Sequence, residues 1–186
     1  MKNILSIVIF IFGLLIGLNT NAKDLNMSNK NILVAYFSAT GITEKLATRL
    51  AQAVEGKLFE IKPLTPYTSE DLNWHDKQSR SSVEMNDKSS RPKIASKLED
   101  ITQYDVIFVG FPIWWYREPS IIDTFIESYD FSGKVIVPFA TSGMSGMGDC
   151  RENLQKLAPQ AKVFEGKRFI YNISEEDLKQ WADKWL

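Results

Sequence analysis

The chain has 186 residues, of which 44% are hydrophobic and 24% are charged, and its formal net charge is -1 at pH 7. This length suits one domain with a sizeable core. The near-zero charge, with both signs interspersed, excludes the strongly basic surface typical of nucleic-acid-binding proteins. A single cysteine, Cys150, and a single histidine, His75, exclude an internal disulfide, a Ser-His-Asp or Cys-His catalytic group, and a metal-ligand cluster of plausible spacing.

The first 22 residues have the pattern of a secretory signal peptide. Lys2 supplies a positive charge, an apolar run extends from Ile4 to Leu18, and Thr20-Asn21-Ala22 offers small residues at the expected cleavage positions. An uncleaved membrane anchor fits less well, because the run is short for a span. We therefore expect a signal peptide at 1–22, a flexible arm at 23–30 and one domain at 31–186. The protein would be periplasmic or extracellular, without a stable membrane anchor after cleavage.

A strand, a loop and a helix follow one another from Ile32 onward. The apolar run Ile32 to Phe37 predicts a buried parallel strand, and the small or hydroxylated residues Ser38 to Thr43 follow it. Open α/β sheets bind ligands at the carboxyl ends of their strands, and helix N-termini attract anions, so this loop predicts a phosphate site. No Lys follows Gly41 and no Gly-x-Gly-x-x-Gly is present, which excludes a P-loop and a dinucleotide fingerprint. Helix capping by the same hydroxyls fits the loop equally well.

The remaining apolar patterns alternate between strands and helices. We expect strands at 57–62, 105–110, 134–140 and 161–165, the last with a continuation over 168–171. We expect helices at 44–56, 69–83, 91–101, 119–128, 149–158 and 174–185, with Pro119 as a first helical residue and with Ser69, Asp149 and Ser174 as N-caps. This alternation predicts an α/β domain with a doubly wound, five-stranded parallel sheet and helices on both faces.

Three short motifs, in this order along the chain, resemble those of the flavodoxin family. Ser38-Ala39-Thr40-Gly41-Ile42-Thr43 is similar to the phosphate-binding loop of that family, and two later segments, 110–115 and 141–148, resemble the loops that hold the flavin ring. The resemblance runs from about Asn31 to the C-terminus. It implies non-covalently bound FMN and the strand order 2-1-3-4-5, for which flavodoxin is itself the type example. The residues implied for the phosphate are Ser38, Thr40, Gly41, Ile42 and Thr43, and those for the ring are Pro112, Ile113, Trp114, Trp115, Thr141, Ser142, Gly143 and Gly146.

Aromatic residues after the third strand are the expected platform for the flavin ring. The resemblance implies that Trp114 or Trp115 stacks on the ring, and we favour Trp115, although core packing or a subunit contact is an alternative for either residue. The insertion 64–92, with Trp74 and His75, would lie near the flavin in relatives of this kind. It is therefore expected to form a substrate or partner surface, and a solvated excursion with one packed Trp fits the sequence equally well.

The resemblance implies an FMN-binding redox protein that either carries electrons to a partner protein or reduces a small molecule such as a quinone. Near-neutral charge and the enlarged middle segment favour a small-molecule reductase or a specialised shuttle, because the typical electron shuttles of this family are strongly acidic. A hypothesis from another class is an exported, non-redox module that keeps the fold and binds a ligand or a protein. The sequence leaves open the electron donor, the acceptor, and the choice between a monomer and a homodimer.

Overall fold

The computed structural model describes residues 30–170 and 172–186. The predicted signal peptide, 1–22, and nearly all of the predicted arm, 23–30, lie outside the described residues. Within the described ranges, none of the helices combines the length and the apolar character that a bilayer-spanning segment requires.

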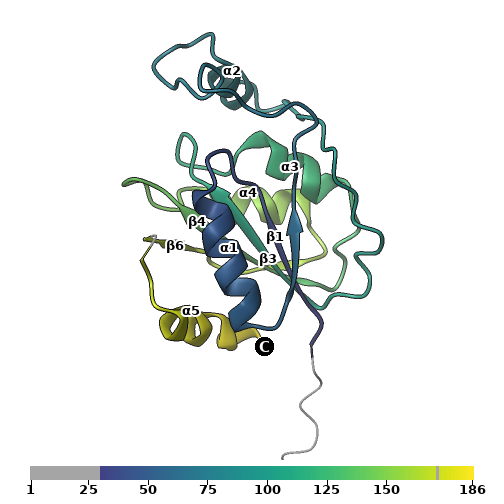
Figure 1. Ribbon diagram of the computed structural model, residues 1–186. Coiled ribbons are helices and arrows are strands. Elements are labelled where there is room, and N and C mark those ends of the chain that lie inside the picture. Colours follow the sequence, from purple (N-terminus) through teal and green to yellow (C-terminus); the bar gives the residue numbers. More distant parts are fainter. Residues whose placement is uncertain (1–29, 171) are drawn as a thin grey trace, which may run out of the picture.

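A parallel sheet with the strand order β2-β1-β3-β4-β5 forms the centre of the domain (Figure 1). Helices connect its strands, so the predicted doubly wound α/β fold and the order 2-1-3-4-5 are confirmed. Four strands make up most of the sheet: β1 (Ile32–Tyr36), β2 (Lys57–Glu60), β3 (Val106–Pro112) and β4 (Val135–Thr141).

The fifth position of the sheet is divided between two short strands, β5 (Lys162–Val163) and β6 (Lys167–Phe169), which both pair with β4. The Phe164 amide donates a hydrogen bond to the Ile136 carbonyl, so the backbone groups of Ile136 face β5 and β6. Alternate residues of a strand direct their backbone groups to the same neighbour, so those of Pro138 face this side as well. Proline has no N–H to donate, and the ladder is interrupted beside it. The predicted strand at 161–165 and its continuation therefore correspond to β5 and β6, which together occupy the fifth position of the sheet.

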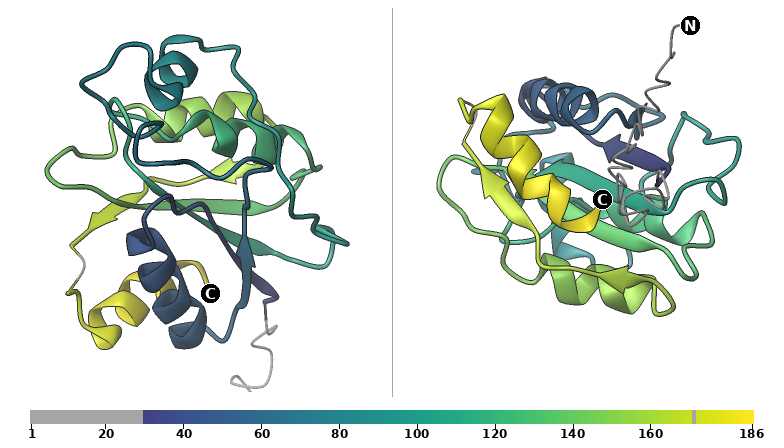
Figure 2. Two further views of the ribbon diagram at one scale, coloured as in Figure 1. Left: turned by 45° about the horizontal axis from the view of Figure 1, so that its top comes forward. Right: turned by 90° about the horizontal axis from the view of Figure 1, so that it is seen from below.

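The sheet is covered on both faces (Figure 2). One face packs against α1 (Ile42–Ala53) and α5 (Glu175–Ala182), which is followed by the 3-10 helix η1 (Asp183–Trp185). The other face packs against α3 (Ser120–Glu127) and α4 (Cys150–Leu157). Successive side chains of each strand alternate between the two cores, which explains why Val106 to Val109 are all fully buried.

The insertion 64–92 differs from its prediction, because its helix is shorter and begins later. Only α2 (Arg80–Asn86) is helical, with the Ser79 hydroxyl accepting a hydrogen bond from the Ser82 amide. Upstream of it, the Asn73 side chain accepts a hydrogen bond from the His75 amide and the Asp76 side chain accepts one from the Gln78 amide. These local turns compete with a continuous helix, so the predicted start at Ser69 is wrong.

The predicted helix over 91–101 is also wrong. This stretch is extended where it pairs with the chain that follows β2, through an antiparallel bridge between Pro63 and Ile94. The Leu64 amide donates to the Lys93 carbonyl at 2.8 Å and the Ala95 amide donates to the Lys62 carbonyl at 2.7 Å. The apolar spacing correctly marked Leu98 and Ile101 as core residues, but these backbone bonds replace those of a helix.

Three predicted helix starts have mixed outcomes. Ser174 caps α5, since its hydroxyl accepts a hydrogen bond from the Asp177 amide at 3.0 Å, as expected. Pro119 lies at the N-cap of α3 rather than inside its first turn. Asp149 occupies the N-cap of α4, but its side chain makes no capping hydrogen bond.

A close approach between β3 and β4 makes Gly110 essential to the sheet. Gly110 is paired with Phe139, and a Cβ added at Gly110 would lie 2.2 Å from Cζ of that fully buried ring. We expect Gly110→Ala to lower the free energy of unfolding by about 1–3 kcal/mol, because the core must absorb the added methyl group. Chemical denaturation followed by circular dichroism measures this change.

The matched control is Gly143→Ala, because a Cβ at Gly143 meets no atom within 4 Å. Its free energy of unfolding should stay within about 0.5 kcal/mol of the wild type. Equal effects of the two substitutions would contradict the packing argument.

Candidate functional site

Three loops meet at the carboxyl ends of β1, β3 and β4, which are adjacent in the sheet. They are the predicted phosphate loop, 38–43, and the two loops predicted to hold the flavin ring, which span 112–118 and 141–149 in the structure; we call them the phosphate loop and the first and second ring loops. The Phe37 amide donates to the Gly110 carbonyl at 2.9 Å, and the Ile113 amide donates to the Thr141 carbonyl at 2.9 Å. All the residues predicted to bind the cofactor therefore lie in one region of the molecule.

The phosphate loop leads directly into α1, and its hydroxyl groups do not cap that helix. The N-cap of α1 is Gly41, which has a φ of 82° and makes no side-chain capping bond. The Ser38 Oγ atom is buried and has no hydrogen-bond partner within the described residues. Because a buried hydroxyl without a partner is costly, this atom is best explained by a ligand that accepts a hydrogen bond from it. Of the two interpretations that the sequence left open, the geometry favours anion binding.

A hydrogen bond between two threonine hydroxyls ties the phosphate loop to the second ring loop. The Oγ1 atoms of Thr43 and Thr141 lie 2.8 Å apart, and both side chains are buried. Thr43 was predicted as a phosphate donor, but part of its hydrogen-bonding capacity is used here. Ser38 and the exposed Thr40 carry the more available hydroxyls of the loop.

Trp114 and Trp115 have different environments. Trp114 is partly buried and packs edge-on against Phe37 and Tyr67, with ring centroids 5.6 Å and 5.3 Å away. Trp115 is 42% exposed. Tyr67 comes from the insertion, where its hydroxyl donates to Glu84 Oε2 and its ring lies under the Arg80 guanidinium. The insertion thus contributes a wall beside the first ring loop.

The first ring loop reverses direction in a two-residue hairpin turn. Trp114 and Arg117 exchange two backbone hydrogen bonds of 3.0 Å, and the residues between them, Trp115 and Tyr116, have φ values of 45° and 64°. Positive φ at both central positions is typical of a type I′ turn, in which Asn-Gly is usual. Here the turn carries two large aromatic residues, and Tyr116 is 70% exposed.

The second ring loop is open on one side and held tightly on the other. A Cβ at Gly143 or Gly146 would meet no neighbour within 4 Å, and Met144 is 92% exposed. By contrast, a Cβ at Gly148 would lie 1.8 Å from the Tyr116 carbonyl oxygen, which also accepts a hydrogen bond from the Asp149 amide. The two ring loops are therefore docked against each other at Tyr116.

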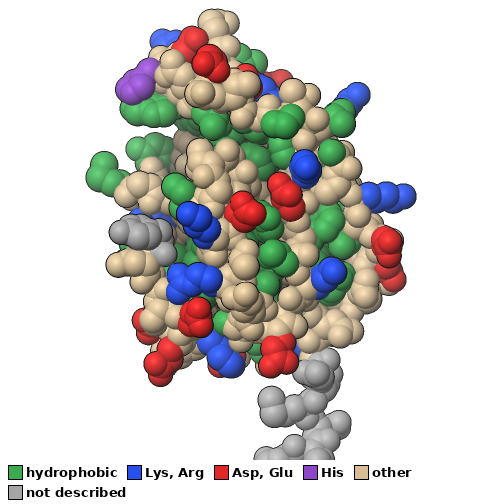
Figure 3. All heavy atoms as spheres, viewed as in Figure 1, with side chains coloured by type: hydrophobic (Ala, Val, Ile, Leu, Met, Phe, Trp, Pro, Cys, Tyr) green, Lys and Arg blue, Asp and Glu red, His purple; other side chains and the backbone are tan. Residues whose placement is uncertain are grey.

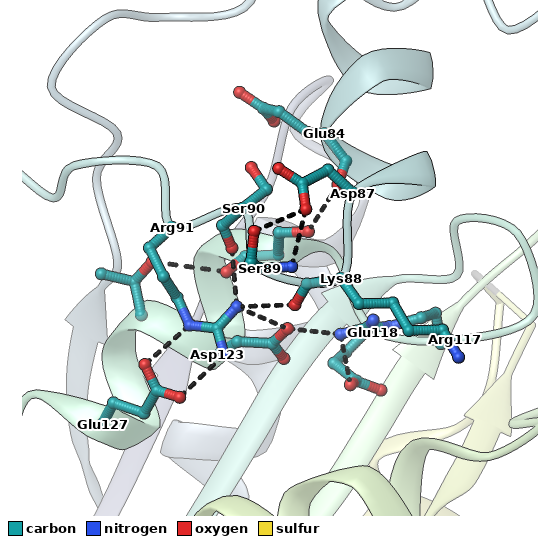
Figure 4. A network of polar contacts seen from close by, with 12 residues as sticks. Glu84, Asp87, Lys88, Ser89, Ser90, Arg91, Arg117, Glu118, Asp123 and Glu127 are labelled. Carbon is teal, nitrogen blue, oxygen red and sulfur yellow. Dashed lines mark hydrogen bonds and ion pairs between the residues drawn. The ribbon is translucent and has the colours of Figure 1, made fainter.

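A network of acidic and basic side chains connects the end of the first ring loop to its neighbours (Figure 4). The Arg117 guanidinium donates to Glu118 at 3.0 Å and to Asp123 on α3. Arg91, from the end of the insertion, lies 3.8 Å from Asp123 and forms a bidentate pair with Glu127. The network joins the insertion, the ring loop and α3.

Two acids of this network have raised pKa values, because burial disfavours their charged forms. Burial raises the pKa of the Glu118 carboxyl to about 7 even though Arg117 opposes the shift. The pKa of Asp123 is raised for the same reason. The Cys150 thiol adjoins Glu118, and burial raises its pKa as well. A cysteine at a helix N-terminus can have a lowered pKa and be reactive, but Cys150 is buried and inert.

The insertion exposes both apolar and charged side chains. The space-filling view shows hydrophobic side chains on the insertion, near His75, the one residue drawn in purple (Figure 3). Across residues 30–170 and 172–186, no group of three or more His, Cys, Asp or Glu side chains is arranged to hold a metal ion. A separate groove of about 1050 Å³ lies at the amino ends of the strands, where Lys30, Val54, Tyr104 and Leu186 contribute to its walls, far from the three loops.

A family model described as Flavodoxin matches residues 31–185. The chain belongs to the flavodoxin family. Candidate flavoproteins from Bacteroides eggerthii and Bacteroides uniformis are each 50% identical to it, with TM-scores of 0.79 and 0.78. The alignments cover 84% and 83% of this chain and 98% of each of those chains. Among curated proteins, none matches this chain.

A more distant member of the same fold is a flavoprotein from Lactobacillus acidophilus, whose structure is a complex with FMN. It is 20% identical to this flavodoxin-family chain, with a TM-score of 0.64 over 84% of this chain and 98% of the other. At this level of identity the likeness shows the shared fold.

Sequence reasoning missed several residues of this flavodoxin-family site. Arg117, Glu118 and Asp123 form the buried network, and Tyr67 packs on Trp114. In sequence, Arg117 and Glu118 look like part of a solvated turn and Asp123 looks like a polar residue on a helix, so only their burial reveals the network. The pair Trp115-Tyr116 carries no turn signal, because bulky aromatic residues rarely adopt positive φ.

The raised pKa of Glu118 predicts how stability depends on pH. The folded protein holds the Glu118 proton up to about pH 7, whereas the carboxyl of the unfolded chain loses it near the ordinary value of 4.5. The contribution of this group is therefore complete below about pH 4.5 and is lost as the pH rises through about 7. We expect Glu118→Gln, which resembles the protonated form at every pH, to flatten the fall in melting temperature between pH 5 and 8.

The control for this pH series is Glu127→Gln. The Arg91 hydrogen bond lowers the pKa of Glu127, so this carboxylate stays ionised throughout the range and its loss should leave the slope unchanged. An identical slope in wild type and Glu118→Gln would show that Glu118 is not the titrating group. Circular dichroism melting curves in buffers of equal ionic strength provide the measurement.

Proposed function

We propose that this protein binds FMN non-covalently and uses it to reduce a small neutral molecule such as a quinone. Membership of the flavodoxin family supports FMN as the cofactor. The observation that carries the proposal is the Ser38 hydroxyl, which is buried without a partner in the loop before an uncapped helix N-terminus. An FMN phosphate would accept a hydrogen bond from this hydroxyl and would also face the unpaired backbone N–H groups of α1.

The chain's own residues would bind and shield the flavin. Thr40 and the amides at the start of α1 would hold the phosphate together with Ser38. Trp115, partly exposed on the first ring loop, would stack on the ring, and the open stretch from Thr141 to Gly146 would offer backbone amides to its pyrimidine edge. FMN supplies the electron transfer, which the side chains around the site cannot provide.

Charge around the site favours a small neutral acceptor over a charged protein partner. Within the three loops, the stretches 38–43, 112–116 and 141–148 contain no Asp, Glu, Lys or Arg. Charged residues flank these stretches at Glu44, Arg117 and Asp149, and Arg168 donates to the Ser142 carbonyl. Electrostatic steering of a partner protein needs charge at the contact surface, whereas a quinone is neutral and planar. Reduction of a quinone to the hydroquinone needs two electrons and two protons; reduced FMN would supply the electrons with one of the protons, and water would supply the other.

The second candidate is a non-redox module that uses the same pocket for another ligand or for a protein. The exposed apolar residues Tyr116 and Met144 support it, because solvent-exposed apolar groups are typical of interaction surfaces. The partnerless Ser38 hydroxyl does not distinguish the two candidates by itself, since any phosphate-bearing ligand would satisfy it.

Titration with FMN separates these candidates. Wild type should bind FMN with mutual quenching of flavin and tryptophan fluorescence, and Ser38→Ala should weaken binding about tenfold or more, because a hydrogen bond to a charged group is lost. The apo form of Ser38→Ala should be as stable as wild type or more stable, since its hydroxyl has no partner in the chain. Thr40→Ala and Trp115→Ala should also weaken binding.

Ser132→Ala is the matched control, because this exposed hydroxyl bonds only to Asp130 and Gln160 in a turn before β4. A folded wild type that fails to bind FMN at micromolar concentration would overturn the flavoprotein proposal and favour the non-redox module. With FMN bound, bleaching of the flavin by NAD(P)H would indicate a reductase that uses this donor. Bleaching by dithionite alone would indicate a different donor.

We also propose that the protein is exported and that residues 1–22 are removed, as the sequence pattern suggests. Intact-mass measurement of the protein from its native compartment should then give a chain that begins at Lys23. A chain that retains Met1 and fractionates with membranes would contradict the proposal.

A further inference from the structure

The two-residue turn in the first ring loop is unusual in composition. Within the described residues, positive φ outside glycine occurs at Glu55, Trp115 and Tyr116, so two of the three positions are consecutive and aromatic. Left-handed backbone is unfavourable for any residue with a Cβ, and residues held there persist only when their surroundings fix them. Asn-Gly would make the same turn without this strain.

Packing inside the protein does not explain why these residues are aromatic. Trp114, just before the turn, gains ring contacts with Phe37 and Tyr67. In contrast, Trp115 is 42% exposed and Tyr116 is 70% exposed. A strained position that leaves a large ring in solvent lowers stability without a matching gain in the core. A contact with a molecule outside the chain accounts for the Tyr116 ring better than core packing does.

The structure around the turn keeps it in place from three directions. Arg117 closes the hairpin with two backbone bonds to Trp114, and its guanidinium is fixed by Glu118 and Asp123, both almost fully buried. From the second ring loop, the Asp149 amide donates to the Tyr116 carbonyl. Buried ion pairs of this kind are weak sources of net stability, and their best-supported use is to fix one conformation.

We propose that Tyr116 contacts the electron acceptor, a neutral planar aromatic molecule, and that Arg117 and Asp123 are positioning residues that hold its ring in the strained turn. The inference rests on the proposed function, in which Trp115 is the residue assigned to the flavin. Tyr116 lies next to it on the same turn and is more exposed, in a stretch, 112–116, that contains no charged residue. A second flat ring at this position gives an aromatic acceptor a stacking surface.

The first test compares Tyr116→Gly with wild type. Glycine accepts positive φ, so the melting temperature of the apo protein should rise by about 2 °C. Rapid mixing of anaerobic, dithionite-reduced, FMN-loaded protein with 1,4-naphthoquinone gives an apparent Kd and a limiting rate of flavin reoxidation. The apparent Kd should rise about three- to tenfold with little change in the limiting rate, because a stacking contact is lost.

Two variants control this comparison. Glu55→Gly relieves the same kind of strain at a φ of 52°, at the end of α1 and on the opposite edge of the sheet, so it should raise the melting temperature without changing the apparent Kd. Tyr116→Phe keeps the ring and should keep the apparent Kd within about twofold of wild type.

A double-mutant cycle tests the positioning role. Asp123→Asn should raise the apparent Kd in the wild-type background but not in the Tyr116→Gly background, since there the ring is already absent. A purely structural role for Asp123 would give the same effect in both backgrounds and would overturn this assignment. An unchanged apparent Kd in Tyr116→Gly would overturn the acceptor contact.

Failure of the proposed function gives a different result from failure of this inference. If wild type does not bind FMN, the flavoprotein proposal is wrong, and the acceptor role of Tyr116 is overturned with it. The apo melting temperatures of Tyr116→Gly and Glu55→Gly still decide whether the turn is strained, because they require no cofactor. If FMN binds and only the Kd for naphthoquinone fails to respond, the cofactor assignment stands and the acceptor contact alone is wrong.

Discussion

Parallel pairing of β1, β3 and β4 is the interaction on which the site depends. Residues Ile32 to Tyr36 align with Val106 to Gly110, which in turn align with Val135 to Phe139, so all three strands end at one edge. Their loops then lie within hydrogen-bonding reach, as the Thr43 and Thr141 hydroxyls demonstrate. Since the strands are buried on both faces, the cores that stabilise the fold also fix the relative positions of the phosphate loop and the two ring loops.

Charge is distributed in an unusual way around this edge. The stretch 112–116 is uncharged, while Arg117, at the end of the aromatic turn, pairs with the buried acids Glu118 and Asp123. Burying these groups costs solvation free energy, and Glu118 Oε2, Asp123 Oδ1 and Arg117 Nε have no hydrogen-bond partner within the described residues. The arrangement lowers stability locally and holds a strained turn in one conformation. Such strain is typical of functional sites and fits a loop that must present aromatic rings to ligands.

The sequence predicted regular elements well where one local pattern dominated. Continuous apolar runs identified β1, β3 and β4, and the Ser174 cap identified the start of α5. It failed where distant backbone groups competed for hydrogen bonds. The apolar spacing of 91–101 suits a helix, but the chain after β2 offers backbone partners that hold part of the stretch extended. In the insertion, Asn and Asp side chains form local turns and shorten the predicted helix to α2.

The sequence by itself determined the fold class, the strand order through a family resemblance, and the three loops of the site, because hydrophobic periodicity and short loop motifs are local properties of the chain. Only the tertiary structure decided which hydroxyl is left without a partner, which tryptophan is enclosed, and which acids are buried. Within the described residues the Ser38 hydroxyl has no hydrogen-bond partner, whereas the Thr43 hydroxyl bonds to Thr141, which is 98 residues away along the chain. Glu118 acquires its raised pKa from packing against α3 and α4. Hydrogen-bond partners and side-chain burial depend on contacts between segments that are distant along the chain, so a local sequence pattern does not predict them.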